Sequence, residues 1–173
     1  MTRMSRTLLA IVATASFWGL MMPEESAVAA TAPNPLTLYS GSLRVTPAGG
    51  AKPYRLVNDC SEVGRYFACQ QTADGSVVGL LVVIPTSTSG HYYTQTLLPE
   101  GRATGRDELE ILGNQWTFKS SRLDGGKTTY FRTTNTFSGK NHIHFERAES
   151  TDGKQWTIKY TGDQTREEAG KAR

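Results

Sequence analysis

The sequence has three histidines and two cysteines, the residue types that bind transition metals most readily, and their spacing limits what they could do. Two histidines alternate in His142-x-His144, and Glu146 or Glu149 could complete a set of ligands. Histidines at positions i and i+2 of a strand share one face, as a metal chelate requires. The strand registers derived below place His142, His144 and Glu146 on the outward face. We therefore expect this pair to be solvated, with no bound metal and no cofactor.

Signatures of other catalytic chemistry are scarce. The sequence contains no Gly-x-Ser-x-Gly nucleophile elbow and no glycine-rich phosphate loop. His91 beside Tyr92 and Tyr93 could form an acid–base cluster, but alternating tyrosines on a strand more often supply core and rim positions. The balance favours a protein that is not an enzyme, with isomerase or hydrolase chemistry at a barrel mouth as an alternative.

The only two cysteines are spaced for a structural disulfide. If Gly64-Arg65 forms a two-residue turn, Cys60 lies opposite Cys69 at a non-hydrogen-bonded site, where antiparallel side chains approach most closely. Export into an oxidising compartment makes such a bond the expected state. A catalytic dithiol would instead prefer Cys-x-x-Cys spacing.

Short glycine-containing turns divide the second half of the sequence into strands and fix how the strands pair. Two-residue loops such as Gly113-Asn114, Asp124-Gly125 and Asp152-Gly153 suit hairpins because they accept positive φ angles, and Gly139-Lys140-Asn141 makes a longer break. The pairs that these turns predict are Leu109–Phe118 and Ile111–Trp116, Phe118–Phe131 and Trp116–Thr133, Phe137–Ile143 and Asn135–Phe145, and Phe145–Tyr160, Arg147–Ile158 and Glu149–Trp156.

These registers place the large apolar residues of every hairpin on one face, and a slip of one residue would expose them. Further strands are expected at about residues 36–45, 54–63, 66–72, 77–84 and 91–98, with no convincing helix. The unbroken apolar run of 77–84 suits a strand covered on both faces. The sequence therefore predicts an all-β fold, an antiparallel up-and-down meander closed into a β-barrel of about 8–10 strands.

The first 30 residues have the features of a secretory signal peptide. Arg3 and Arg6 form a basic start, residues 8–22 an apolar stretch, and Ala27-Val28-Ala29-Ala30 a candidate cleavage site. We expect residues 31–166 to form a single barrel domain and residues 167–173 a disordered charged tail. The mature protein would then be secreted or periplasmic, with no membrane span after cleavage.

The formal net charge of +3 is dispersed along alternating strand positions. Nucleic-acid binding requires a concentrated basic face with stacking aromatic residues. We therefore expect no nucleic-acid partner.

Two segments resemble exported bacterial lipocalin-like (calycin) domains, many of which have no assigned activity. One is Cys60 with Phe67-x-Cys69-Gln70. The other runs from Arg132-x-x-Asn135-x-Phe137 through Phe145-x-x-x-x-Ser150-x-Asp152-Gly153-x-x-Trp156. The resemblance covers most of the mature chain and implies a barrel with a lumen, without a particular substrate.

Arg147 is the sharpest candidate for a binding residue, because the predicted registers turn its charge inward. A charge left unpaired inside a protein costs several kcal/mol, so Arg147 needs a partner such as a ligand carboxylate. The other candidate ligand-binding residues share its predicted face, and they are Trp116, Phe118, Phe131, Thr133, Asn135, Trp156 and Tyr160. They would hold a small apolar or amphipathic molecule.

Two alternatives remain open for this interior. Arg147 could bond Glu149 or reach the rim over a filled core. The protein would then act as a module for an envelope protein partner, or as an inhibitor, through loops such as 86–90 and 99–106.

Overall fold

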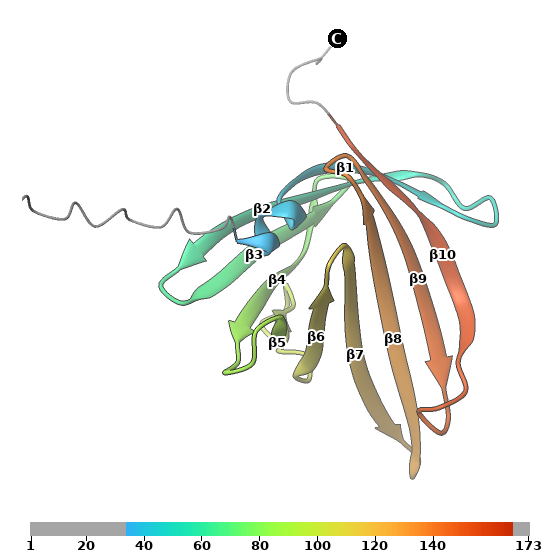
Figure 1. Ribbon diagram of the computed structural model, residues 1–173. Coiled ribbons are helices and arrows are strands. Elements are labelled where there is room, and N and C mark those ends of the chain that lie inside the picture. Colours follow the sequence, from blue (N-terminus) through green and yellow to red (C-terminus); the bar gives the residue numbers. More distant parts are fainter. Residues whose placement is uncertain (1–33, 168–173) are drawn as a thin grey trace, which may run out of the picture. The chain divides into compact units, whose positions relative to one another are not determined.

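The computed structural model describes residues 34–167. The predicted signal peptide and residues 168–173 of the predicted tail lie outside the described residues. Ten strands follow one another as an antiparallel meander (Figure 1). They are β1 Gly41–Pro47, β2 Tyr54–Val63, β3 Tyr66–Ala73, β4 Ser76–Pro85, β5 His91–Leu97, β6 Asp107–Leu112, β7 Gln115–Asp124, β8 Lys127–Ser138, β9 His142–Ser150 and β10 Thr157–Arg166. Each strand pairs with its neighbours in the sequence, and β1 pairs with β10 to close the barrel. The predicted all-β barrel is confirmed.

The predicted first strand is wrong in its first half. A 3-10 helix, η1, occupies Pro35–Tyr39, and β1 begins only at Gly41. Pro35 suits a helix start because its φ angle is fixed and its missing N–H has no partner to lose. The Asn34 side chain accepts a hydrogen bond from the Leu36 backbone N–H at 3.1 Å. Leu36 then lies buried against the core, 4 % exposed.

The hairpins around β7 to β9 agree with the predicted pattern, with one shift. The pairs of β6 with β7 and of β8 with β9 are those predicted. Between β7 and β8 the prediction is wrong by two residues, because Phe118 faces Thr133 and not Phe131. The turn uses Gly125 and Gly126, both with positive φ angles, so Asp124 stays in the strand. A shift of two residues leaves every side chain on its predicted face.

The β9–β10 connection differs more, because Asp152-Gly153 does not form a tight hairpin turn. The Asp152 carboxylate accepts hydrogen bonds from the backbone N–H groups of Lys154 and Gln155, both at 2.8 Å. Those N–H groups hold the pKa of Asp152 below its ordinary value. A wider loop at residues 151–156 results, and an irregularity between Ile158 and Tyr160 shifts the register again.

The predicted pairs of this last hairpin are therefore wrong. Tyr160 pairs with Arg147, and Gly162 pairs with Phe145. Ile158 pairs with Ala148, on the outward face, and is 55 % exposed.

Barrel closure depends on a close approach between β1 and β10. Gly162 pairs with Pro47 on one side and with Phe145 on the other. A Cβ atom at Gly162 would lie 2.6 Å from the Thr46 carbonyl oxygen and 2.8 Å from the Phe145 ring. Only glycine lets the three strands approach this closely.

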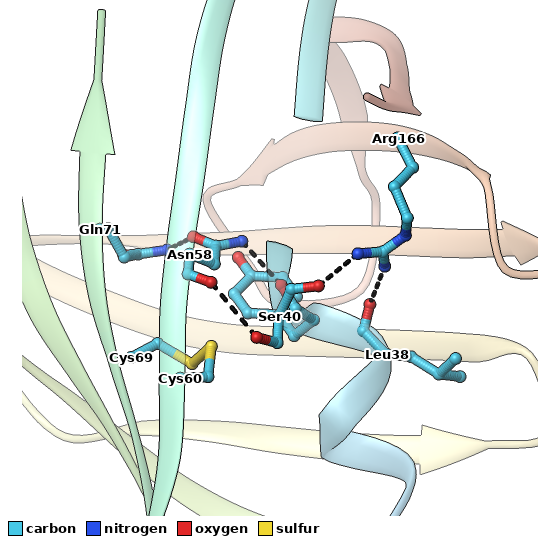
Figure 2. The surroundings of a disulfide bond; sticks show 8 residues. Leu38, Ser40, Asn58, Cys60, Cys69, Gln71 and Arg166 are labelled. Carbon is cyan, nitrogen blue, oxygen red and sulfur yellow. Dashed lines mark hydrogen bonds between the residues drawn. A yellow bond between two sulfur atoms is a disulfide. The ribbon is translucent and has the colours of Figure 1, made fainter. Parts of the chain in front are cut away.

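Arg166 ties the end of β10 to η1, as Figure 2 shows. Its guanidinium donates to the backbone carbonyls of Leu38 at 2.8 Å, of Ser40, and of Lys140 at 2.9 Å. Beside it, buried Asn58 donates to the Tyr39 carbonyl at 3.0 Å and accepts from Gln71 at 3.0 Å. One end of the barrel is thus closed by η1, and we call the half next to it the closed half.

We expect Arg166→Met to destabilise the protein by about 2–3 kcal/mol, because it removes charge-assisted hydrogen bonds to three backbone carbonyls. Urea denaturation measures this loss. Arg44→Met is the matched control, since Arg44 is exposed on the neighbouring strand β1. Equal midpoints for the two variants would show that Arg166 does not hold η1 to the barrel.

The predicted disulfide joins Cys60 of β2 to Cys69 of β3, which pair directly across the hairpin. Replacing both cysteines by alanine should lower the free energy of unfolding by about 2–3 kcal/mol, because the unfolded chain loses a closed loop. Reducing the wild-type protein should lower its urea midpoint as much as the double substitution does. An unchanged midpoint on reduction would contradict the bond.

Candidate functional site: the open half of the barrel

The two halves of the barrel interior differ in how well their inward side chains are covered. In the closed half, Leu109 and Trp116 are each 1 % exposed. Trp116 packs between Tyr39 of η1, with ring centroids 5.9 Å apart, and Phe137 of β8, at 4.7 Å. In the other half, Arg147 and Tyr160 are exposed although strand alternation turns both inward. We call this half, which adjoins the turn at Gly125-Gly126, the open half.

An aromatic ring flanked by two arginines forms the centre of the open half. The guanidinium carbons of Arg122 and Arg147 each lie 5.4 Å from the centroid of the Phe131 ring. Alternation from buried Trp116 turns Arg122 inward, and alternation from Phe145 does the same for Arg147. A guanidinium over an aromatic face is held in place and keeps its outer N–H groups free to donate.

Neither arginine is neutralised by a carboxylate within residues 34–167, where the ion pairs all involve other residues. The alternative in which Arg147 forms an ion pair with Glu149 is therefore not what the structure shows. Glu149 pairs across the ladder with Phe131. Two positive charges on one wall favour an anionic group near them.

Tyrosines and one carboxyl group add polarity to the same interior. Burial raises the pKa of Tyr54, and the nearby Tyr160 raises it further. The Tyr160 ring lies 5.6 Å from the Phe145 ring, centroid to centroid. Asp107 of β6 shares the inward parity of Leu109, and burial raises its pKa. The open half therefore combines apolar rings with groups that can donate or accept hydrogen bonds.

The predicted ligand-binding residues are divided between three places. Phe118, Phe131, Thr133, Arg147 and Tyr160 face the open half, with Thr133 between Phe118 and Arg147 in the ladder. Whether they bind a ligand stays a prediction.

Trp116 and Asn135 belong to the packed closed half, where Asn135 is 4 % exposed. Trp156 lies on the outer face, because its ring stacks on the outward guanidinium of Arg132, whose Cζ is 4.5 Å from the ring centroid.

Three residues of the open half were not predicted from the sequence: Tyr54, Asp107 and Arg122. The alternation that turned Phe118 inward also reaches Arg122 four residues later, so the signal for Arg122 was present. Asp107 and Tyr54 stand at strand ends next to loops, where the sequence does not fix which face a side chain occupies.

The other candidate clusters lie on the outer face. A cleft of about 430 Å³ is lined by residues including His91, Tyr93, Glu110 and Lys119. Glu110 Oε2 accepts a hydrogen bond from Lys119 at 3.1 Å, and the other carboxylate oxygen, Oε1, lies 4.0 Å from His91 Nε2. Tyr92 also lines this cleft, although it pairs with Leu109, whose side chain is buried in the core.

Among the described residues, no group of three or more His, Cys, Asp or Glu side chains could hold a metal ion in the positions that they occupy in the structure. Within the same range, no helix has the length and apolar character needed to cross a membrane.

A scan against protein-family models found no matching family, and a search of curated proteins found no match. The closed antiparallel barrel is consistent with the lipocalin-like architecture that the sequence resembles, at the level of the fold.

Asp107→Asn should stabilise the protein near neutral pH. A carboxyl group with a raised pKa destabilises the folded state while it is ionised, and this penalty is complete above the folded-state pKa. The penalty disappears as the pH falls through that pKa toward the ordinary value of about 3.9. We therefore expect a higher urea midpoint for the variant at about pH 7 and nearly equal midpoints at about pH 3.

The matched control is Asp59→Asn, at an exposed outward position of β2. A lower midpoint for Asp107→Asn at neutral pH would show that the carboxylate has a stabilising partner.

Proposed function

We propose that the protein is an exported binding protein that holds a small amphipathic molecule in the open half of its barrel. The apolar part of the ligand would lie against Phe118, Phe131 and Tyr160. Its anionic group would accept hydrogen bonds from Arg147, and Arg122, equally close to the Phe131 ring, would add a second positive charge. The disulfide fits an oxidising compartment, and so supports export.

One observation carries this proposal: two inward arginines without carboxylate partners stand beside inward rings that remain accessible. Tyr160 is 38 % exposed, whereas inward Trp116 of the closed half is 1 % exposed. An interior built only for stability would bury its rings and leave out unpaired charges. A barrel of about this size is wide enough for one small ligand once part of its interior is unfilled.

Two dyes that differ by a single anionic group test the site. 8-Anilinonaphthalene-1-sulfonate and N-phenyl-1-naphthylamine share their ring system, and only the first carries a sulfonate. We expect both to fluoresce when bound, and Arg147→Met to weaken sulfonate binding about tenfold while changing the neutral dye by less than about twofold. Fluorescence titration gives both dissociation constants.

Arg44→Met controls for the loss of one positive charge, because Arg44 is exposed and outward on β1. Thermal denaturation of each variant controls for dye binding to loosened protein. Native mass spectrometry of the wild-type protein adds a dye-free measurement of any retained molecule. Equal weakening by Arg44→Met, or no binding of either dye, would contradict the proposal.

The outer side of β4 favours a second candidate function, contact with an envelope protein partner. The sequence predicts that the apolar run of residues 77–84 is covered on both faces, but within residues 34–167 its outward side is only partly covered, with Val82 and Ile84 half-buried and Leu80 exposed. Leu80 is 36 % exposed, and Leu97, its partner across the ladder, is 44 % exposed. Exposed apolar surface of this kind marks interaction sites. Absence of any bound dye or retained molecule would favour this candidate.

A further inference from the structure

Two histidines and one aspartate meet on the outer face of β9 and β10, away from the barrel interior. The Asp163 carboxylate oxygen Oδ1 lies 3.2 Å from His142 Nε2 and 3.0 Å from His144 Nδ1. The three side chains are between 43 and 49 % exposed. The three side chains thus lie next to one another and are accessible to ions in solution.

The irregular register of the last hairpin creates this cluster. The tight turn predicted from Asp152-Gly153 would pair His144 with Thr161. In the structure His144 pairs with Asp163, and His142 pairs with the next residue but one, Thr165. A carboxylate therefore stands directly across from one histidine and diagonally across from the other, which the sequence alone did not reveal.

We propose that His142, His144 and Asp163 form a binding site for a divalent transition metal, for which we take Zn²⁺ as the probe. Imidazole nitrogens with one carboxylate are an established ligand set for Zn²⁺, with water in the fourth position. Two ligand atoms each about 2.0–2.1 Å from a tetrahedral metal lie about 3.3–3.4 Å apart. The nitrogen–oxygen separations of 3.0 and 3.2 Å are within a few tenths of an ångström of that spacing.

The three side chains do not yet surround a common point, because Asp163 Oδ1 lies between the two rings, hydrogen-bonded to His144 Nδ1 and close to His142 Nε2. A metal would take the place of this hydrogen bond and this close contact. The half-exposed carboxylate has room to rotate, while both rings keep their strand positions. Metal binding would therefore require a rearrangement of the Asp163 side chain alone.

The surroundings of His144 fit the protonation state that metal binding requires. If Nδ1 binds the metal, the ring proton must reside on Nε2 and needs an acceptor. Thr161 Oγ1 lies 3.3 Å from Nε2 and donates its own proton to the Phe145 carbonyl at 2.9 Å. Its lone pairs are thus free to accept from Nε2, and Glu146 Oε1 lies further away at 3.9 Å.

The third histidine of the chain provides an internal control. His91 lies on β5, near Glu110 but without a second histidine, so it has one carboxylate neighbour and no chelate. If any histidine bound the metal independently, replacing each of the three would weaken binding equally. If His142 and His144 form a chelate, only their replacement would weaken binding strongly.

Isothermal titration of the untagged, full-length protein with ZnCl₂ tests the site. We expect one Zn²⁺ per chain, and at least about tenfold weaker binding for His144→Gln, His142→Gln and Asp163→Asn. His91→Gln should bind as the wild type does. Co²⁺ should give the visible absorption of a four-coordinate nitrogen–oxygen site, lost in the same three variants.

Circular dichroism of each variant establishes that it is folded. Substoichiometric binding to the wild type, or equal weakening by His91→Gln, would overturn the proposal. Unchanged binding by Asp163→Asn would also overturn it, because that result would show that Asp163 is not a metal ligand. The dye titrations above do not involve these residues, so the two proposals succeed or fail separately.

Discussion

The structure depends on how β10 fits between β1 and β9, because this strand alone closes the barrel. Gly162 permits the close approach at one end of the seam, where any Cβ atom would meet the Thr46 carbonyl and the Phe145 ring. Arg166 then fastens the end of the strand to η1 through backbone carbonyls. The absence of a side chain at Gly162 lets the strands approach, and Arg166 holds η1 over the closed half. Both residues belong to β10, so the strand that closes the barrel also holds the helix that covers one of its ends.

That plug explains why the interior is divided. Leu36 and Tyr39 of η1 supply the apolar contacts that complete the core around Trp116. No corresponding element of the described chain covers the far end, where Arg122, Arg147 and Phe131 face inward. The same alternation of side chains thus produces a packed core in one half and an accessible, positively charged interior in the other, according to whether a helix covers it.

Much of the fold was predictable from the sequence, because side-chain alternation tolerates register errors of two residues. Placing the β7–β8 turn at Asp124-Gly125 and not at Gly125-Gly126 left Phe118 and Phe131 facing inward. The β9–β10 connection was not predictable from a turn motif, because the Asp152 side chain bonds to the backbone and widens the loop. Trp156 consequently moved from the expected inner wall to the outer face. η1 was missed because a capped five-residue 3-10 helix lacks the periodicity that identifies longer helices.

The irregularity between Ile158 and Tyr160 affects both faces of the sheet at once. Since neighbouring side chains of a strand point to opposite faces, one change of register resets every cross-strand pair on each side. Inside, it places Tyr160 beside Arg147, adding an aromatic hydroxyl to the wall that carries the charge. Outside, it places Asp163 between His142 and His144. Removing the irregularity would therefore change the interior wall and disperse the outer cluster together, although no residue of either group would be altered.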